Sequence, residues 1–434
     1  MTPSSACGLH QERKKESRKA EALAHGRSGL GKGLLAIPAL ALIGATDPAS
    51  AANPNSSFDI YGFAQLDYIQ DFKRVAPDWV DTLRPSRIAV PEGEFGTNGQ
   101  ASLSVKQTRF GVKGFMPTGE NTSPLFFKFE FDLFGVGVDA GQTTIRLRYA
   151  YGEWGQWLAG QTTSLFMDLD IFPNVIDYWG PCGMVFLRNP QIRWTPRNND
   201  EDYFAVAIEK PSNDVDAGNI RTIGEFAEAN VQGNQVVPDL TAQYQRRGSW
   251  GHVQLAGILR DVGYNVQVAP GAPWQKGSAT GWGLDLTGVL NTGIGKDQVL
   301  LGVVYGHGIA SYMNDGGMDL APTAAFNPAA PTPTLSAEAV PLTGVSAYYN
   351  HWWSPMFSTA VGYAFTEVTN TNFQDAGVFH KGQYASVNVL VYPAQKLFFG
   401  IEALWGELQT NNGESGTDYR FQVSVHYDFG AKIL

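Results

Sequence analysis

The sequence has few of the features that a disulfide-bonded secreted protein or a helical membrane protein would need. It contains two cysteines among 434 residues, and Cys7 lies in a leader that we expect to be removed. The one remaining cysteine, Cys182, cannot form an internal disulfide, so an exported chain of this length must be held together in another way. No apolar run approaches the roughly 20 residues that a membrane-spanning helix needs, which excludes a helical membrane protein.

Aromatic residues are absent from the first 51 positions, although the chain has 25 Phe, 17 Tyr and 11 Trp. That segment has instead a long basic region, an apolar run at 34–45 that contains Pro38, and Ala-Ser-Ala at 49–51. This order is typical of a secretory signal, and we predict cleavage after Ala51. The alternative, a transmembrane anchor, needs a longer run. The sequence therefore predicts a signal peptide at 1–51 and a single domain at 52–434.

Positive charge is scarce in the predicted mature chain. Removing the seven basic and four acidic residues of the leader leaves 24 Lys and Arg against 37 Asp and Glu, a formal net charge of −13. A nucleic-acid partner is therefore not expected.

Residues 125–154 contain two arms in which apolar and polar residues alternate with a period of two. A glycine-rich turn separates the arms. On the first arm, large apolar residues alternate with Lys128, Glu130 and Asp132. On the second, Ile145, Leu147, Tyr149 and Tyr151 alternate with Arg146, Arg148, Ala150 and Gly152. One apolar face and one charged face fit a barrel wall with lipid outside and water inside. A half-buried hairpin of a soluble β protein has the same period, so this segment alone leaves both readings open.

Similar strand signals recur along the whole chain and favour the barrel. The other segments are 58–68, 104–115, 156–166, 191–196, 203–210, 239–247, 252–262, 280–290, 298–307, 342–353, 356–368, 383–392, 396–408 and 419–429. Together they predict an all-β, transmembrane antiparallel β-barrel of about 16 strands. Short turns at 353–355 and 392–394 are expected on the periplasmic side, and long loops near 71–100, 211–238 and 311–341 outside the cell.

One long loop, 167–188, has no strand periodicity but many apolar residues. Such a loop needs a surface to pack against, and the inside of the barrel offers one. We therefore expect loop 167–188 to fold inward and form the constriction.

Several short motifs resemble the DcaP-like trimeric porins of Gram-negative outer membranes. They are Gly-Gln-Trp-Leu-Ala-Gly-Gln-Thr at 155–162, Phe-Met-Asp at 166–168, Gly-Pro at 180–181, Arg188, Gln-Ile-Arg-Trp-Thr at 191–195, Tyr-Asn-His-Trp-Trp-Ser-Pro at 349–355 and Phe-Gly-Ile-Glu-Ala-Leu-Trp-Gly-Glu at 399–407. The resemblance implies a sixteen-stranded homotrimer in the outer membrane with an inward-folded third loop. It also implies surroundings of lipid and lipopolysaccharide, and uptake of small anionic solutes such as dicarboxylates.

A passive pore needs a narrow place and an electric field there. The residues that we expect to line the pore are Arg109, Lys113, Arg146, Arg148, Asp168, Asp170, Arg188 and Arg193. A carboxylate about 4 Å from one guanidinium gains roughly 1 to 4 kcal/mol, depending on the local dielectric constant. The arginines can therefore form a ladder for anions, or they can pair with Glu130, Asp132, Asp168 or Asp170 and only neutralise the lumen. The sequence leaves both roles open.

Other functions have weaker support. A barrel with a closed lumen and a structural or adhesive role is the main alternative, and a barrel hydrolase that uses His307 or His426 with a nearby serine is the lesser one. The seven histidines show no zinc spacing, no cofactor is predicted, and a near match to a phosphate-binding loop at 26–33 lies in the leader.

Overall fold

The structure is a computed structural model. It describes residues 56–119, 122–135, 143–218, 220, 228–331 and 333–433. The predicted signal peptide and the turn at 136–142 lie outside the described residues. Within these ranges, no helix combines the length and the apolar character that crossing a membrane requires.

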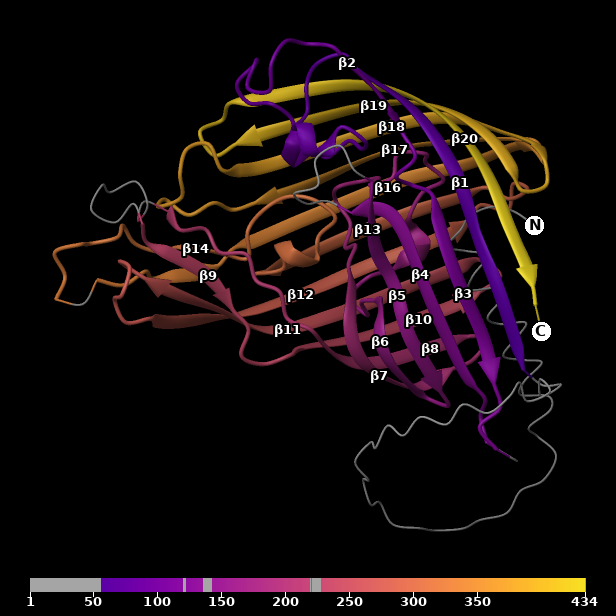
Figure 1. Ribbon diagram of the computed structural model, residues 1–434, viewed down its shortest axis with the longest axis horizontal. Helices are drawn as coiled ribbons and strands as arrows, with labels where there is room; N and C mark the ends of the chain where they lie inside the picture. Colours follow the sequence, from indigo (N-terminus) through magenta and orange to yellow (C-terminus); the bar gives the residue numbers. More distant parts are fainter. Residues whose placement is uncertain are drawn as a thin grey trace.

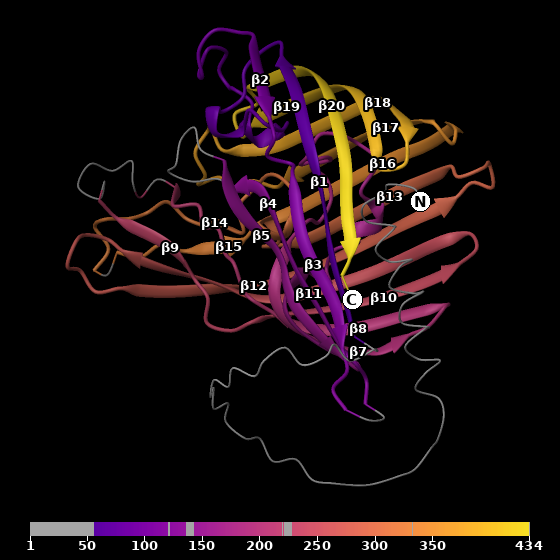
Figure 2. The same cartoon turned by 45° about the vertical axis from the view of Figure 1, so that its right-hand side comes forward.

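All described strands except β14 and β15 form one closed antiparallel barrel (Figures 1 and 2). Each barrel strand pairs with the next one along the chain, and the last strand pairs with the first from Asp59 opposite Lys432 to Asp71 opposite Arg420. Two barrel strands are interrupted: β2 and β3 both pair with β1, and β9 and β10 both pair with β11. The sixteen barrel strands are β1 Ser57–Asp71, β2 Gln100–Ser104 with β3 Arg109–Met116, β4 Leu125–Gly135, β5 Thr144–Trp154, β6 Trp157–Thr163, β7 Arg188–Asn198, β8 Asp202–Glu209, β9 Asn230–Asn234 with β10 Asp239–Gly248, β11 Gly251–Gln267, β12 Gln275–Asn291, β13 Gln298–His307, β16 Pro341–Ser354, β17 Phe357–Val368, β18 Phe379–Ala394, β19 Leu397–Thr410 and β20 Ser415–Lys432.

The predicted number of strands is confirmed. Every predicted segment overlaps one barrel strand, although the ends differ, as for 104–115, where β3 begins only at Arg109. A small hairpin, β14 (Leu320–Pro322) with β15 (Ala337–Ala339), and four single-turn 3-10 helices lie in the described parts of the long connections: η1 Pro77–Trp79, η2 Pro85–Arg87, η3 Leu169–Ile171 and η6 Ala310–Tyr312.

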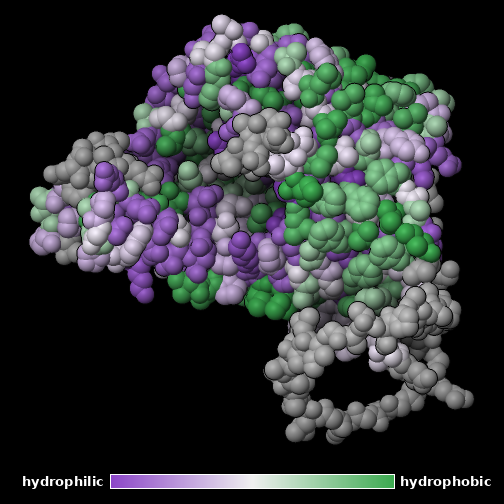
Figure 3. Space-filling model, in the orientation of Figure 1, coloured by the Kyte–Doolittle hydropathy of each residue, from purple (hydrophilic) through white to green (hydrophobic). Residues whose placement is uncertain are grey.

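Side chains along the strands alternate between the outer surface and the interior. On β1, Leu66 and Tyr68 are 47% and 41% exposed, whereas Asp67 between them is fully buried. Figure 3 shows hydrophobic residues gathered over β3, β4 and β20 on the right of the view, and hydrophilic residues toward the opposite end. An apolar outer wall around a polar interior is the arrangement that a barrel in lipid requires.

The alternation on β5 breaks at one point, which corrects the expected orientation of two tyrosines. The pairing with β4 shifts register between Glu130 opposite Tyr149 and Phe131 opposite Leu147, so Arg148 is an extra residue in a β-bulge. After the bulge, Tyr149 and Tyr151 point inward, and each is 5% exposed. The prediction that both tyrosines face lipid was wrong because a bulge reverses the parity of every residue beyond it.

The prediction that the long connections are external loops is also partly wrong. In the connection 72–99, Val75, Leu83 and Ile88 are almost fully buried in one core cluster with residues of the connection 164–187 and of the wall. In the connection 308–340, Leu320 is fully buried in a second cluster. These apolar side chains need a dry surface, and they find it by folding back over the lumen.

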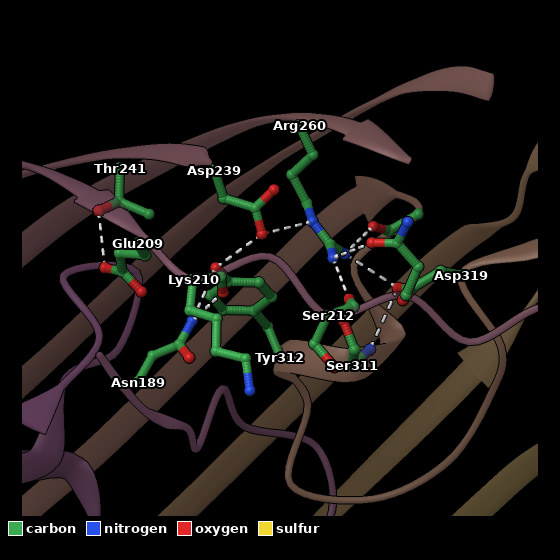
Figure 4. A network of polar contacts seen from close by, with 12 residues as sticks. Asn189, Glu209, Lys210, Ser212, Asp239, Thr241, Arg260, Ser311, Tyr312 and Asp319 are labelled. Carbon is green, nitrogen blue, oxygen red and sulfur yellow. Dashed lines mark hydrogen bonds and ion pairs between the residues drawn. The ribbon is translucent and has the colours of Figure 1, made fainter. Parts of the chain in front are cut away.

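Arg260 on β11 fastens two of these connections to the wall (Figure 4). Its side chain is fully buried and pairs with Asp239 on β10 and Asp319 of the connection 308–340, both at 3.0 Å. The same guanidinium donates to the carbonyl oxygen of Ser212, in the connection that follows β8, and to that of Gly308, in the connection 308–340. One buried cation therefore holds together backbone from two separate connections.

Replacing Arg260 with alanine should destabilise the barrel. The change leaves the carboxylates of Asp239 and Asp319 buried without their partner, which costs about 3 to 5 kcal/mol. Unfolding in urea, followed by the shift in gel mobility of unheated samples, measures the loss. A matched control is Arg246→Ala on the neighbouring strand β10, whose ion pairs are half exposed and contribute little. Equal losses in the two variants would contradict the fastening role.

Candidate functional site

A cavity of about 670 Å³ lies where the inner wall meets the connections 72–99, 164–187 and 308–340. Arginines dominate the charged side chains that line it. The charged lining residues are Arg84, Arg87, Arg146, Arg148, Arg188, Asp214 and Asp315. Five cations against two carboxylates make this cavity electropositive, although the chain as a whole is acidic.

Arg146 and Arg148 project inward from β5 and share the carboxylates of β4. Arg146 Nη2 donates to Asp132 Oδ2 at 2.8 Å, and Arg148 Nη1 donates to the same oxygen at 3.0 Å. Arg148 Nε donates to Glu130 Oε1 at 2.7 Å, and both guanidiniums contact the hydroxyl of Tyr178. These pairs are the neutralising network that the sequence left open, yet both arginines also line the cavity.

Further cations crowd around the Glu130 carboxylate. Lys128 Nζ lies 3.3 Å from Glu130 Oε2, and Arg109 Nε lies 3.6 Å from Glu130 Oε1. Arg109 also stands over the ring of Phe63 at 4.9 Å. Because several cations share few carboxylates, the cluster keeps an excess of positive charge beside the cavity.

Arg188, the first residue of β7, supplies part of this excess. Its guanidinium lies over the rings of Phe186 at 4.9 Å and Tyr149 at 5.3 Å. Among the described residues, no carboxylate lies within ion-pairing distance of Arg188. Its charge is therefore compensated less directly than the charges of Arg146 and Arg148, and it can act on a solute in the cavity.

Two arginines of the cavity come from the connection 72–99 and were missed in the sequence. The Arg84 guanidinium lies 4.2 Å from the ring centroid of Trp79 and 4.7 Å from that of Trp179, and it pairs with Asp315 at 2.8 Å. Arg87 is exposed on the cavity side. The sequence feature that could have identified them is the set of apolar residues in this loop, which indicates that the loop packs against the protein and is not fully exposed to solvent.

Asp214 is one of the two acidic residues that line the cavity. Burial, reinforced by the neighbouring carboxylate of Asp319, raises the pKa of Asp214. Its negative charge is therefore lost at a higher pH than that of an ordinary aspartate, which makes the cavity more positive as the pH falls.

The inner loop, residues 164–187, follows the wall from inside the barrel. Its backbone at Ile176 donates to Glu402 of β19 at 2.6 Å, and the ring of Tyr178 stacks on Phe134 of β4 with centroids 4.1 Å apart. Farther along, a Cβ at Gly183 would collide with carbonyl oxygens of β16 and β17. These contacts with strands on several sides of the barrel define the path of the inner loop and the edge of the cavity.

The remaining residues predicted to line the pore lie outside this cavity. Lys113 stands over the ring of Tyr61 at 5.8 Å, and Arg193 Nη2 donates to the carbonyl oxygen of Thr163 at 2.6 Å. Asp168 and Asp170, at the start of the inner loop, lie against β11 and β12. Of the eight predicted residues, the structure thus brings together Arg146, Arg148 and Arg188.

The two histidines considered for a hydrolase have other partners. His307 stacks on Trp282 and contacts the Tyr305 hydroxyl. His426 is hydrogen-bonded to Gln65 and Asp428. In the part of the chain that the structure describes, neither imidazole is hydrogen-bonded to a serine.

Comparisons with known proteins agree with this architecture. The family model described as DcaP outer membrane protein matches residues 43–429. The outer membrane channel DcaP of Acinetobacter baumannii has a TM-score of 0.70 at 21% identity, over 86% of this chain and 97% of that one. The anion-selective porin from Comamonas acidovorans has a TM-score of 0.54 at 9% identity, over 86% of this chain and 100% of that one. A search of curated proteins finds no match.

The docking of the inner loop can be tested at Cys182. Its side chain is 1% exposed, and its Sγ lies 3.5 Å from the carbonyl oxygen of Gly382. Burial raises the pKa of the thiol, so the unreactive protonated form prevails at neutral pH. We expect a maleimide reagent to label Cys182 slowly in the folded barrel and fully in denaturant.

Two alanine variants sharpen this test. In Gly183→Ala the added methyl group should displace the loop. A clash that costs about 1.4 kcal/mol or more raises the population of the undocked loop, and with it the labelling rate, about tenfold or more. Gly377→Ala is the control, because its added methyl group meets no atom within 4 Å. Rapid labelling of the unaltered protein would show that the inner loop is not docked.

Proposed function

The chain belongs to the DcaP outer membrane protein family, and from this premise we propose that its lumen favours small anionic solutes such as dicarboxylates. The coarser function follows from the family and the fold: the protein is a porin of the bacterial outer membrane. Porins conduct passively, so the selectivity must come from the shape and charge of the lumen.

The observation that carries the proposal is the cavity with five arginines and two aspartates. We propose that the inner loop narrows the lumen at this cavity, so that a passing solute meets the arginines at short range. A guanidinium can bind a carboxylate through two parallel hydrogen bonds, which suits a solute with carboxylate groups. Several arginines in reach of one another allow the solute to move from one to the next without being trapped.

The acidic charge of the whole chain does not oppose this preference. Charges farther away than a Debye length of about 8 Å are largely screened at physiological ionic strength. The arginines at the cavity act at shorter range, so their sign outweighs the net charge of the chain at the narrowest point.

Arg188→Gln should reduce the preference for anions. In a water-filled lumen the lost attraction is about 1 kcal/mol, so the anion-to-cation permeability ratio should fall by up to about fivefold at low salt. The reversal potential across a planar bilayer under a KCl gradient measures this ratio. Arg193→Gln is the control, because Arg193 lies on the same strand but outside the cavity.

Three outcomes of these recordings would count against the proposal. Equal shifts in both variants would mean that the selectivity does not arise at the cavity. A cation preference of the unaltered protein at low salt would reject the arginine argument while leaving the pore. An absence of single-channel conductance would favour the alternative of a closed structural or adhesive barrel.

We further propose that the mature chain begins at Ala52 and assembles as a homotrimer surrounded by lipid and lipopolysaccharide. The resemblance of the motifs to trimeric porins supports the assembly, and the composition of the first 51 residues supports the cleavage. Native mass spectrometry of the protein extracted from membranes checks both. The expected mass is three times that of a chain starting at Ala52. The mass of a monomer would contradict the trimer, and the mass of an uncleaved chain would contradict the cleavage site.

A further inference from the structure

A second group of ionisable side chains lies at the start of the inner loop, outside the arginine cavity. In the part of the chain that the structure describes, Asp168, Asp170 and His252 are the one group of histidine and acidic side chains spaced to hold a metal ion. Their ligand atoms all lie within 4.8 Å of one another. Asp168 directly precedes η3 in the inner loop, Asp170 is the second residue of η3, and His252 is the second residue of β11 in the wall.

The group is rigidly placed. His252 Nε2 lies 2.8 Å from Asp168 Oδ2, and the hydroxyl of Thr287 donates to the same oxygen at 2.7 Å. The backbone amide of Asp170 donates to Asp168 Oδ1 at 3.0 Å. These contacts fix the orientation of the Asp168 carboxylate and hold it against the imidazole, as neighbouring groups do for metal ligands in general.

A further carboxylate, that of Asp285, lies near Asp168 but outside the group. Asp285 projects from the inward face of β12, two residues from Thr287, and is 3% exposed. Its Oδ2 has no hydrogen-bond partner among the described residues, although it interacts electrostatically with Asp168. An unpaired carboxylate oxygen is costly to bury, so Asp285 adds to the negative charge that a cation bound near Asp168 would offset.

Arg247 does not neutralise the group through an ion pair among the described residues. Arg247 interacts electrostatically with Asp168 and Asp170, but its guanidinium hydrogen-bonds to Gln245 and Asn198 and lies 5.2 Å from the ring of Tyr203. The Asp170 carboxylate has no hydrogen bond or ion pair within the described residues. Two carboxylates, those of Asp168 and Asp170, thus share one imidazole.

We propose that Asp168, Asp170 and His252 bind a divalent transition-metal ion that pins the inner loop to β11. One imidazole nitrogen with carboxylate oxygens is a ligand set that suits Zn²⁺, and a water molecule completes four-fold coordination. The ion neutralises the converging carboxylates and joins a loop to a wall strand that lies 84 residues away in the chain. This proposal does not depend on the ion selectivity of the pore.

Isothermal titration with ZnCl₂ tests the site on the full barrel in detergent, purified without a polyhistidine tag and stripped with EDTA. The expected result is one saturable site per chain. Asp170→Asn and His252→Gln should each weaken binding by at least about tenfold, because each removes a ligand. His426→Gln is the matched control, since His426 is also a buried histidine of the wall that contacts an aspartate, Asp428, outside the group.

Each outcome decides for or against the site. Absence of saturable Zn²⁺ binding to the unaltered protein would mean that His252 and Asp168 form a plain ion pair, and the proposal would fail. Equal loss in His426→Gln, or binding of Ca²⁺ in preference to Zn²⁺, would also overturn it. If a ligand variant does not fold, anomalous X-ray scattering at the zinc edge from crystals of the unaltered protein locates the ion directly. A peak between Asp170 and His252 supports the site, and a peak elsewhere rejects it.

Discussion

The constraint on which this structure depends is that no backbone N–H or C=O can stay unpaired in lipid. The chain meets it by pairing β20 with β1, so that the sheet has no free edge among the described strands. Closure of the barrel also determines how its interior is filled. A ring of sixteen strands encloses a lumen wider than its own inward side chains can fill, so the long connections fold back into it. The apolar residues Val75, Leu83 and Leu320 belong to these connections, and they are buried there rather than in the wall.

Arginines inside the barrel differ in how completely carboxylates neutralise their charge. Arg260 and Arg420 have no exposed surface on their side chains and pair with carboxylates, which makes them structural. Arg146 and Arg148 are intermediate, because they pair with the carboxylates of β4 and still border the cavity. Arg188 has no carboxylate within ion-pairing distance in the described ranges. A charge that the protein has not neutralised remains available to a solute, which is the physical basis of the proposed anion preference.

The candidate site was only partly predictable. Arg146 and Arg148 were found because two arginines in a strand of period two fall on the polar face. Their partners Glu130 and Asp132 could be named, since consecutive strands of an antiparallel sheet are neighbours. Arg84 was missed, because its contribution depends on a loop returning over the lumen. The group of Asp168, Asp170 and His252 was missed because its members lie on a loop and a distant strand, with no local spacing to indicate them.

The sequence by itself determined the kind of molecule. Period-two alternation, an even number of strands, the lack of long apolar runs and the leader composition depend on local chemistry, and they predicted a porin barrel. Tertiary structure alone decided which face of β5 carries Tyr149 and Tyr151, because one extra residue in a bulge reverses all later side chains. It also decided where the connections pack and which arginines meet, since these outcomes depend on contacts between residues far apart in the chain. Such contacts leave no periodic trace in the sequence.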